Sequence, residues 1–267
     1  MLLAIDARNR AVRVGFRDAG GWKALRAFGA YHDRSPDEYA HLLCLAAAEA
    51  SGSAPGVFAA EGGLVGEAWI SSVVPALTQK LAAAAETAFG VKASIVGPGV
   101  KSGVRIRTDN PSEVGSDLVC AAAAARELAG GACVVVDFGA VLTVSAIDAS
   151  GDFLGAAIAP GLESAAHALR AAAAQLPEVR LEIPRRAIGK NTSQSVQAGV
   201  VLGYEGLVAR LVQLMREEIA SAGAPAEAIP VIGTGEAIGE AMLSRTRLGR
   251  FVPDLALEGI ALIAGRA

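Results

Sequence analysis

The sequence is poor in aromatic residues and in groups that bind transition metals. Aromatic residues make up 4% of the 267 residues, whereas hydrophobic residues make up 52%, so the core must be built from Ala, Val, Leu and Ile. The three histidines are scattered, and no two cysteines form a CxxC pair. We therefore expect small buried cysteines in a reducing compartment and no transition-metal site. The cysteines are Cys44, Cys120 and Cys133.

The chain also lacks a large excess of either charge. Its formal net charge is −3, and no basic stripe interleaved with aromatics is present, which excludes the usual footprint of a nucleic-acid-binding protein. The N-terminus reaches Asp6 without a basic region, so we expect no signal peptide. Charges interrupt the Ala-rich runs before about 18 residues, which predicts no membrane span. A cytoplasmic protein is the expectation.

Two segments, half a chain apart, share a pattern of strand, acid, turn and strand. Apolar residues 2–5 lead to Asp6, and residues 11–16 alternate as a second strand. Residues 133–147 repeat this order around Asp137. Chance similarity between strands is the alternative, but the repeat favours an internally duplicated α/β protein.

Other elements follow from helix starts and turn residues. Ser35-Pro36-Asp37-Glu38 has the residues of a capping box with Pro at the first helical position. Residues 97–116 are rich in Gly, Pro, Ser and Asp, which predicts a long functional loop. Helices are expected over residues 36–50, 75–89, 117–128, 161–175, 193–222 and 255–264, an irregular stretch over 176–192, and strands over 93–96 and 229–232.

Several common nucleotide-binding and hydrolase motifs are absent. The sequence has no Walker A motif and no GxSxG elbow, and the glycines after residue 96 lack the spacing of a dinucleotide-binding loop. In actin-like kinases, a hairpin with Asp-x-Gly approaches the phosphates and a later Gly-x-Gly turn holds the adenosine. Asp137-Phe138-Gly139 and Gly233-Thr234-Gly235 fit these two elements, although the second also fits an ordinary strand-to-helix turn.

The order of motifs along nearly the whole chain resembles the type III pantothenate kinase family. The hairpin at Asp137 and the turn at Gly233 belong to this series. The other matching segments are Gly97-Pro98-Gly99-Val100-Lys101-Ser102-Gly103, Asp109-Asn110-Pro111 with Gly115 and Asp117, Gly155 to Leu162, Ala187-Ile188-Gly189-Lys190-Asn191-Thr192, Gly199, Gly203-Tyr204 and Asp254-Leu255.

This resemblance implies a duplicated actin-like, ribonuclease H-like fold with two lobes, 1–114 and 115–267, each a mixed sheet flanked by helices. It also implies transfer of the ATP γ-phosphate to pantothenate, the first step of coenzyme A synthesis, with Asp117 as catalytic base. A helix-start acid favoured by the dipole is the alternative for Asp117. The implied substrate-binding residues are Gly97, Gly99, Lys101, Gly103 and Thr192; the nucleotide-binding residues are Asp6, Asn9, Asp137, Gly139, Thr143, Gly233 and Gly235; and the metal-binding residues are Asp6 and Asp137.

The resemblance further implies a divalent metal such as Mg²⁺, and often a monovalent cation, K⁺ or NH₄⁺. Members of the family are dimers in which one subunit completes the pantothenate site of the other, and Thr192 is similar to such a donated residue. A homodimer, or a heterodimer with a paralogous subunit, is therefore expected.

The chain departs from the family pattern at positions near ATP and substrate. Arg8 replaces a glycine of the first hairpin, where two bulky side chains must fit a tight turn. The six departures are Arg8, Arg10, Thr108, Leu118, Ala140 and Glu236. Three hypotheses follow: an active kinase with altered ATP contacts, a subunit that needs a partner, and a pseudokinase with a binding or regulatory role.

Overall fold

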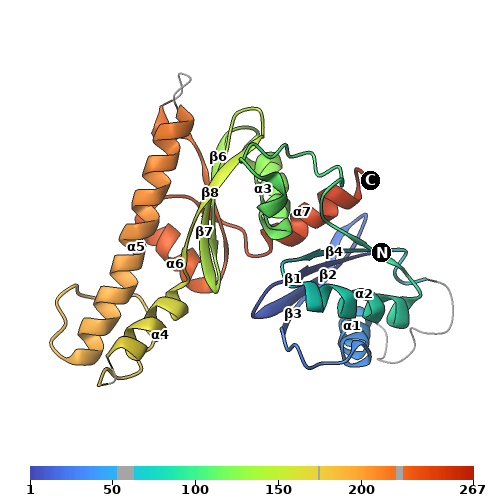
Figure 1. Cartoon of the computed structure of the whole chain (residues 1–267), viewed down its shortest axis with the longest axis horizontal. Coiled ribbons are helices and arrows are strands. Elements are labelled where there is room, and N and C mark those ends of the chain that lie inside the picture. Colours follow the sequence, from blue (N-terminus) through green and yellow to red (C-terminus); the bar gives the residue numbers. More distant parts are fainter. Residues whose placement is uncertain (53–62, 174, 221–224) are drawn as a thin grey trace. The chain divides into compact units, whose positions relative to one another are not determined.

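The computed structural model describes residues 1–52, 63–173, 175–220 and 225–267 (Figure 1). Its contacts divide the chain into two compact units. Unit 1 comprises residues 1–103, 110–124 and 256–267, and unit 2 comprises residues 104–109 and 125–255. The sequence placed a lobe boundary at residue 114, whereas the contacts group two later segments with unit 1.

Unit 1 contains a five-stranded mixed sheet in the order β3-β2-β1-β4-β5. The central strand β1 pairs antiparallel with β2 and parallel with β4. The β1–β2 ladder ends at the pair Ala7 and Val12, and residues 8–10 separate the two strands. The strands are β1 (Leu2–Ala7), β2 (Ala11–Asp18), β3 (Gly21–Gly29), β4 (Glu67–Ser72) and β5 (Ala93–Ile95).

Unit 2 contains a second five-stranded sheet with the same order and strand directions. Its central strand β6 pairs antiparallel with β7 and parallel with β9, as β1 does with β2 and β4. The β6–β7 ladder ends at Phe138 and Leu142, and residues 139 and 140 separate the two strands. The predicted duplication of a mixed α/β sheet is therefore confirmed. The strands are β6 (Cys133–Phe138), β7 (Val141–Ile147), β8 (Phe153–Pro160), β9 (Val231–Gly235) and β10 (Arg250–Phe251).

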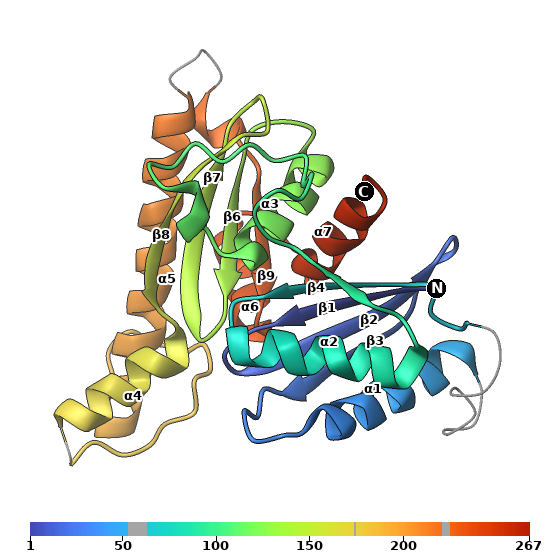
Figure 2. The same ribbon diagram turned by 45° about the vertical axis from the view of Figure 1, so that its right-hand side comes forward.

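Two helices of unit 1, α1 (Pro36–Ser51) and α2 (Pro75–Phe89), lie on the same face of its sheet (Figure 2). Their apolar residues share one buried core with the inward residues of β1 and β2. Each helix ends at a glycine in the left-handed conformation, Gly52 or Gly90, as expected for a helix C-terminus. The predicted helices over residues 36–50 and 75–89 are confirmed.

Helix α7 (Leu255–Ala264) packs against unit 1 through polar and backbone contacts. Glu258 accepts a hydrogen bond from the indole nitrogen of Trp22 at 2.7 Å and pairs with Arg17 at 3.2 Å. A Cβ atom on Gly259 would lie 1.8 Å from the carbonyl oxygen of Cys120, in α3 (Ser116–Ala129), so only glycine fits this approach. These contacts explain why the end of the chain groups with unit 1.

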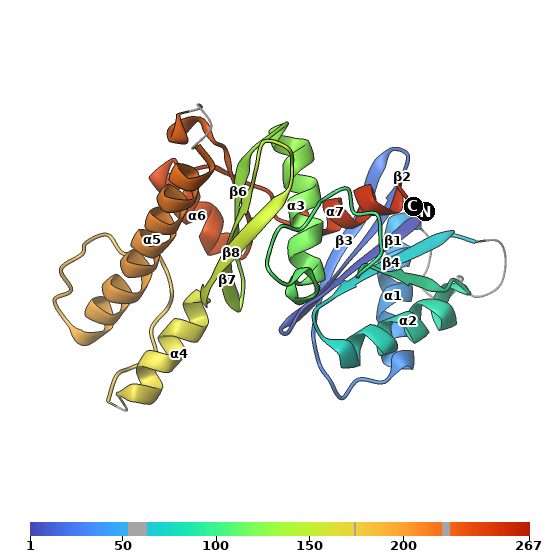
Figure 3. The same cartoon turned by 45° about the horizontal axis from the view of Figure 1, so that its top comes forward.

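In unit 2, α4 (Leu162–Ala172) contacts the long helix α5 (Thr192–Ile219), and α6 (Ala237–Thr246) follows β9 (Figure 3). Helix α5 buries Val201, Tyr204, Val208 and Val212 in the core of this unit. The remaining elements are the short 3-10 helices η1 (Pro111–Glu113) and η3 (Ala226–Ala228).

Helix α5 is long and apolar enough to span a membrane by length and composition, which corrects the expectation that charges interrupt every such run. One side of α5 is covered by strands β6 and β7, as in the core helix of a soluble domain. Helix α4 ends at Ala172, before the predicted end at residue 175, and the predicted end of α5 at residue 222 lies outside the described residues.

The capping box predicted for α1 is present and gives a stability test. The backbone N–H of Glu38 donates to the Ser35 hydroxyl at 3.2 Å, and the N–H of Ser35 donates to the Glu38 carboxylate at 2.7 Å. We expect Ser35→Ala to lower the free energy of unfolding by about 1 kcal/mol, measured by urea denaturation. Ser51→Ala, at the other end of the helix, is the control, and equal losses for both variants would contradict a capping role.

The same contact predicts a pH effect. The hydrogen bond from the Ser35 backbone lowers the pKa of Glu38 below its ordinary value. Because the folded pKa is the lower one, this stabilisation is present above the ordinary pKa and is lost as the pH falls through the folded pKa. The stability difference between the protein and Glu38→Gln should therefore shrink below about pH 4.

Candidate active site

The two hairpin acids occupy equivalent places in the two sheets. Asp6 is the second-last residue of β1 and lies opposite Arg13 and beside Ser71. Asp137 is the second-last residue of β6 and lies opposite Thr143 and beside Thr234. The carboxyl ends of parallel strands are the usual ligand-binding edge of such sheets. Both acids are buried, with 1% and 3% of their surface exposed, so each needs a charged or polar partner.

In unit 2, the turn after β8 holds the tip of the Asp137 hairpin. The N–H of Gly161 donates to the carbonyl oxygen of Ala140 at 3.1 Å, and the Ser164 hydroxyl donates to the same oxygen at 2.9 Å. A Cβ atom on Gly161 would lie 2.0 Å from the Gly139 oxygen, so the Pro-Gly-Leu turn requires glycine here. This segment therefore shapes the phosphate hairpin.

The turn that starts at Gly233 packs against the same hairpin. Gly235 has φ +100, and a Cβ atom on it would lie 2.2 Å from the carbonyl oxygen of Phe138. The N–H of Glu236 donates to that oxygen at 2.6 Å. A Cβ atom on Gly233 would meet Leu243 of α6 at 2.1 Å, which gives this glycine a packing role. Asp137 and the glycines at 139, 233 and 235 are thus brought together.

The polar side chains at this corner include a neutral hydroxyl group and two acids. The Thr143 hydroxyl oxygen is buried and has no hydrogen-bond partner among the described residues. Burial raises the pKa of Tyr204, and the nearby Glu236 and Asp137 raise it further. Two acids, Glu236 and Asp137, therefore lie near Tyr204 at this corner.

The hairpin of unit 1 is filled by an arginine. The Nε of Arg8 donates to the Asp6 carboxylate at 2.8 Å, and its backbone N–H closes the turn on the Ala11 oxygen at 2.9 Å. Among the described residues other than glycine, only Arg247 has a positive φ, so Arg8 adopts an ordinary conformation. The turn therefore accommodates Arg8 without backbone strain, and Asn9 and Arg10 are exposed at its tip.

Asp117 lies in the first turn of α3, near the carboxyl end of β4. The Ser116 hydroxyl lies 3.0 Å from the Ser71 hydroxyl and accepts the backbone N–H of Ser72 at 3.0 Å, which docks the start of α3. Burial raises the pKa of Cys120, and Asp6 and Asp117 raise it further. Unit 1 therefore brings Asp117 and Asp6 to one corner.

The predicted substrate loop is divided between the units. Residues 97–103 belong to unit 1, where Gly99 and Gly103 have φ of +90 and +77 and Arg266 donates to the Ser102 oxygen at 2.9 Å. Lys101 is exposed, and a Cβ atom on Gly97 would meet open space. Residues 104–109 belong to unit 2, where Arg107 pairs with Asp152 at 2.8 Å. The Thr108 hydroxyl is buried there and has no hydrogen-bond partner among the described residues.

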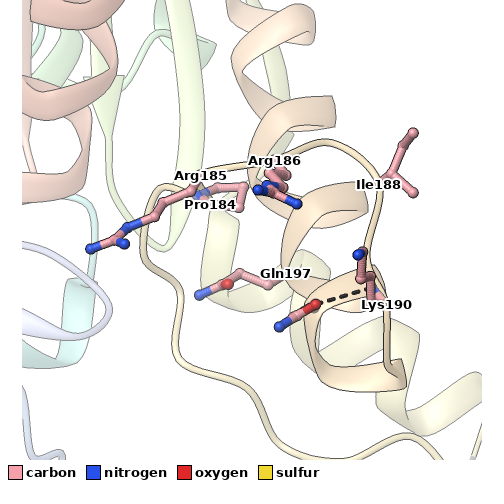
Figure 4. A pocket seen from close by; sticks show the side chains of 7 residues that line it. Pro184, Arg185, Arg186, Ile188, Lys190 and Gln197 are labelled. Atoms are coloured by element: carbon pink, nitrogen blue, oxygen red, sulfur yellow. Dashed lines mark hydrogen bonds between the residues drawn. The ribbon is translucent and has the colours of Figure 1, made fainter.

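The segment before α5 forms a pocket of about 340 Å³ (Figure 4). Asn191 caps α5 by accepting the N–H of Gln194 at 2.9 Å, and Gln194 accepts the N–H of Lys190 at 3.0 Å. Thr192 is exposed in this first turn. Three cations line the pocket, so it favours an anionic ligand. Its lining residues are Pro184, Arg185, Arg186, Ile188, Lys190, Gln194 and Gln197.

Sequence reasoning matched residues 187–192 to a family loop and named Thr192 as substrate-binding, but it described residues 176–192 as irregular and did not predict this pocket. The adjacent pair Arg185-Arg186 was the available signal. The described residues contain no group of three or more His, Cys, Asp or Glu side chains that could hold a metal ion.

Comparison with known proteins relates the sequence of this chain to a family of kinases. The profile of the type III pantothenate kinase family matches residues 2–214. A type III pantothenate kinase of Dehalococcoides mccartyi is 36% identical over 263 residues, covering 98% of this chain and 94% of the relative. One from Moorella thermoacetica is 37% identical over 273 residues, covering 100% of this chain and 99% of the relative.

Solved structures support the fold alone. A protein described as a candidate Baf family transcriptional activator from Campylobacter jejuni has a TM-score of 0.59 at 15% identity, covering 99% of this chain and 98% of that one. A candidate 2-dehydro-3-deoxygalactonokinase from Sinorhizobium meliloti has a TM-score of 0.52 at 12% identity, covering 100% and 96%. The fold is therefore the actin-like kinase fold that the sequence predicted.

Proposed function

Because the chain belongs to the type III pantothenate kinase family, we propose that it takes part in the transfer of the ATP γ-phosphate to the hydroxyl of pantothenate. The observation that carries this proposal is the corner of unit 2, where the Asp137 hairpin, the Gly161 turn and the Gly235 turn are packed into one backbone framework. Phosphoryl transfer depends mostly on positioning and charge neutralisation, and such a framework supplies positioning.

We infer that this framework holds the nucleotide. The turn that contains Gly139 leaves room for phosphate oxygens beside backbone N–H groups, Gly235 lets the second turn pack against this hairpin, and the Thr143 hydroxyl offers a further donor. Glu236 at the start of α6 opposes this binding, because a carboxylate repels an anionic ligand. Weak ATP binding is the expected consequence.

We propose Asp117 as the base that accepts the proton of the pantothenate hydroxyl. Its position at the carboxyl end of β4, fixed by the contact of Ser116 with Ser71, supports this role. A general base must lie within hydrogen-bond reach of the attacking group, and a docked helix start provides a rigid platform for it.

We propose that the loop with Gly97, Gly99, Lys101 and Gly103 and the exposed Thr192 contact pantothenate. Leu118 cannot pair with the pantothenate carboxylate, whereas the cationic pocket beside Thr192 offers suitable charges. Dimerisation is part of the proposal, and exposed apolar side chains on unit 2 support it. These include Leu154 and Ile158 on the edge strand β8 and Ile188 beside the pocket.

Of the two predicted ligands of the implied divalent metal, Asp6 is poorly suited to bind it. Arg8 occupies a carboxylate oxygen of Asp6 at 2.8 Å, so no step of the reaction is assigned to a metal at Asp6. We propose that Asp137 faces Mg²⁺. Binding of a monovalent cation, K⁺ or NH₄⁺, stays a prediction. The cytoplasmic location also stays a prediction.

A second candidate function is favoured by the same Arg8–Asp6 pair. If the hairpin of unit 1 does not support ATP use, the chain acts as a subunit that contributes Thr192 to a paralogous partner, or as a pseudokinase that binds ligand without transferring phosphate. The pair supports these roles because it neutralises an acid that the reaction would use.

One assay separates these candidates. The purified protein is tested for pantothenate phosphorylation alone and mixed with a second family member from the same organism, with the assembly mass measured by light scattering. Turnover by the protein alone supports the active kinase. Activity only in the mixture, lost in Thr192→Ala and retained in Thr246→Ala, supports the subunit role. No activity in either, together with no ATP binding, would contradict the kinase proposal.

A further inference from the structure

Because the fold is duplicated, the hairpin of unit 1 can be compared with the equivalent hairpin of unit 2. Asp6 and Asp137 are each the fifth residue of a six-residue central strand, and each has a parallel partner with a hydroxyl group, Ser71 or Thr234. Two residues after the acid, unit 2 has Gly139 where unit 1 has Arg8. The copies therefore differ at the position that controls access to the carboxylate.

At Asp137 this position is open. A Cβ atom on Gly139 would meet its nearest neighbours, the Val141 oxygen and the Asp137 carboxylate, at ordinary contact distances of 3.5 and 3.8 Å. No side chain at this position therefore stands on the Asp137 carboxylate.

At Asp6 the same position carries a guanidinium. Its Nε bonds one carboxylate oxygen at 2.8 Å, the side chain of Arg8 is 25% exposed, and the carboxylate is 1% exposed. A charge-assisted bond of this length at a buried acid is strong, and it replaces water that the carboxylate would otherwise need. Arg13, directly opposite Asp6 in the ladder, adds a second positive charge to the same face.

We propose that Arg8 serves as a built-in cation at the first hairpin, in the place where a divalent metal would bind Asp6. Mg²⁺ requires a nearly octahedral shell of oxygens, and it would have to displace a guanidinium already bonded to the carboxylate. The positive charges of Arg8 and Arg13 also repel a divalent ion. Phosphate groups at this hairpin would therefore meet guanidinium groups instead of a protein-bound metal.

Mn²⁺ binding to the full chain tests this inference, with the free ion followed by electron paramagnetic resonance. All proteins carry Asp137→Asn, so that the second hairpin does not contribute to binding. We expect no binding linked to Asp6 in this parent. Arg8→Gly, which copies the residue of unit 2, should raise Mn²⁺ affinity at least tenfold, and adding Asp6→Asn should abolish the gain.

The controls separate a local effect from a change in net charge or folding. Arg26→Gly removes an exposed arginine from β3 and should leave Mn²⁺ affinity unchanged. Circular dichroism confirms folding, and Arg8→Ala provides a variant without the added flexibility of glycine. The inference is overturned if the parent binds Mn²⁺ and Asp6→Asn weakens that binding, or if neither Arg8 variant gains affinity. Because the readout is metal binding, its failure is distinct from a failure of the proposed phosphate transfer.

Discussion

Replacing Asp117 with Asn is expected to lower the turnover of pantothenate about 10²–10⁴-fold, the usual contribution of a general base. The change keeps the size of the side chain and its acceptor for the Leu118 N–H, which is bonded at 2.9 Å. The start of α3 should therefore stay docked, because Ser116 holds it to β4. Initial rates over a range of pantothenate concentrations measure the effect, in whichever assembly is active.

The pattern of the kinetic constants distinguishes catalysis from structure. Loss of a base should lower kcat with little change in KM, and the unfolding temperature should stay close to that of the unaltered protein. Glu86→Gln, an exposed acid on α2, is the matched control and should retain full activity. A rate that falls less than tenfold would favour the alternative interpretation, in which Asp117 serves the helix start.

Replacing Gly235 with Ala is expected to destabilise unit 2 and abolish ATP binding. Its φ of +100 is unfavourable for alanine, and the added carbon would lie 2.2 Å from the Phe138 oxygen and 2.9 Å from an Asp137 oxygen. Overpacking typically costs about 1–3 kcal/mol, and backbone strain adds to it. Urea denaturation measures the stability, and titration with ATP measures the loss of binding.

A matched glycine in the same unit controls for the change of residue type. Gly199 lies in α5, and a Cβ atom there would meet nothing within 4 Å. Gly199→Ala should therefore leave ATP binding unchanged and stabilise the helix by about 0.5–1 kcal/mol. If both alanine variants behave alike, Gly235 has no special role at the hairpin.

The sequence predicted the parts of the fold whose signals are local. The buried strands β1 and β6 are apolar runs that end at an acid, and both hairpins follow from them. The capping box at Ser35 and the helix starts at proline have a direct chemical cause, so they were found at the correct residues. Family motifs then indicated which turns to regard as the candidate site.

Elements with mixed patterns were missed. Strand β3 (Gly21–Gly29) exposes residues on both faces without clean alternation, so its period carries little signal. Strand β8 is an edge strand of small and apolar residues that was described only as the approach to a turn. Strand β4 was also missed, although its central residues are buried. In each case, pairing with a neighbouring strand outweighs local preference.

Local sequence signals were also insufficient to predict the contacts within the candidate site. Motifs indicated which residues differ from the family, but not what the replacements contact. The bond between Arg8 and Asp6 depends on the direction of one side chain within the turn, and the pocket beside Thr192 depends on how a loop folds over the start of α5. Such features depend on tertiary structure, and the periodicity of the sequence does not predict them.

The lengths of the two hairpin loops limit how the halves of the molecule can be interchanged. Three residues, 8–10, connect β1 to β2, whereas two residues, 139 and 140, connect β6 to β7. Because adjacent residues of a strand face opposite sides of the sheet, grafting one loop onto the other ladder would change both the loop geometry and the direction of its side chains. Transplanting the whole hairpin loop of unit 2 into unit 1 would therefore also require the deletion of one residue, whereas Arg8→Gly changes a side chain within the existing loop.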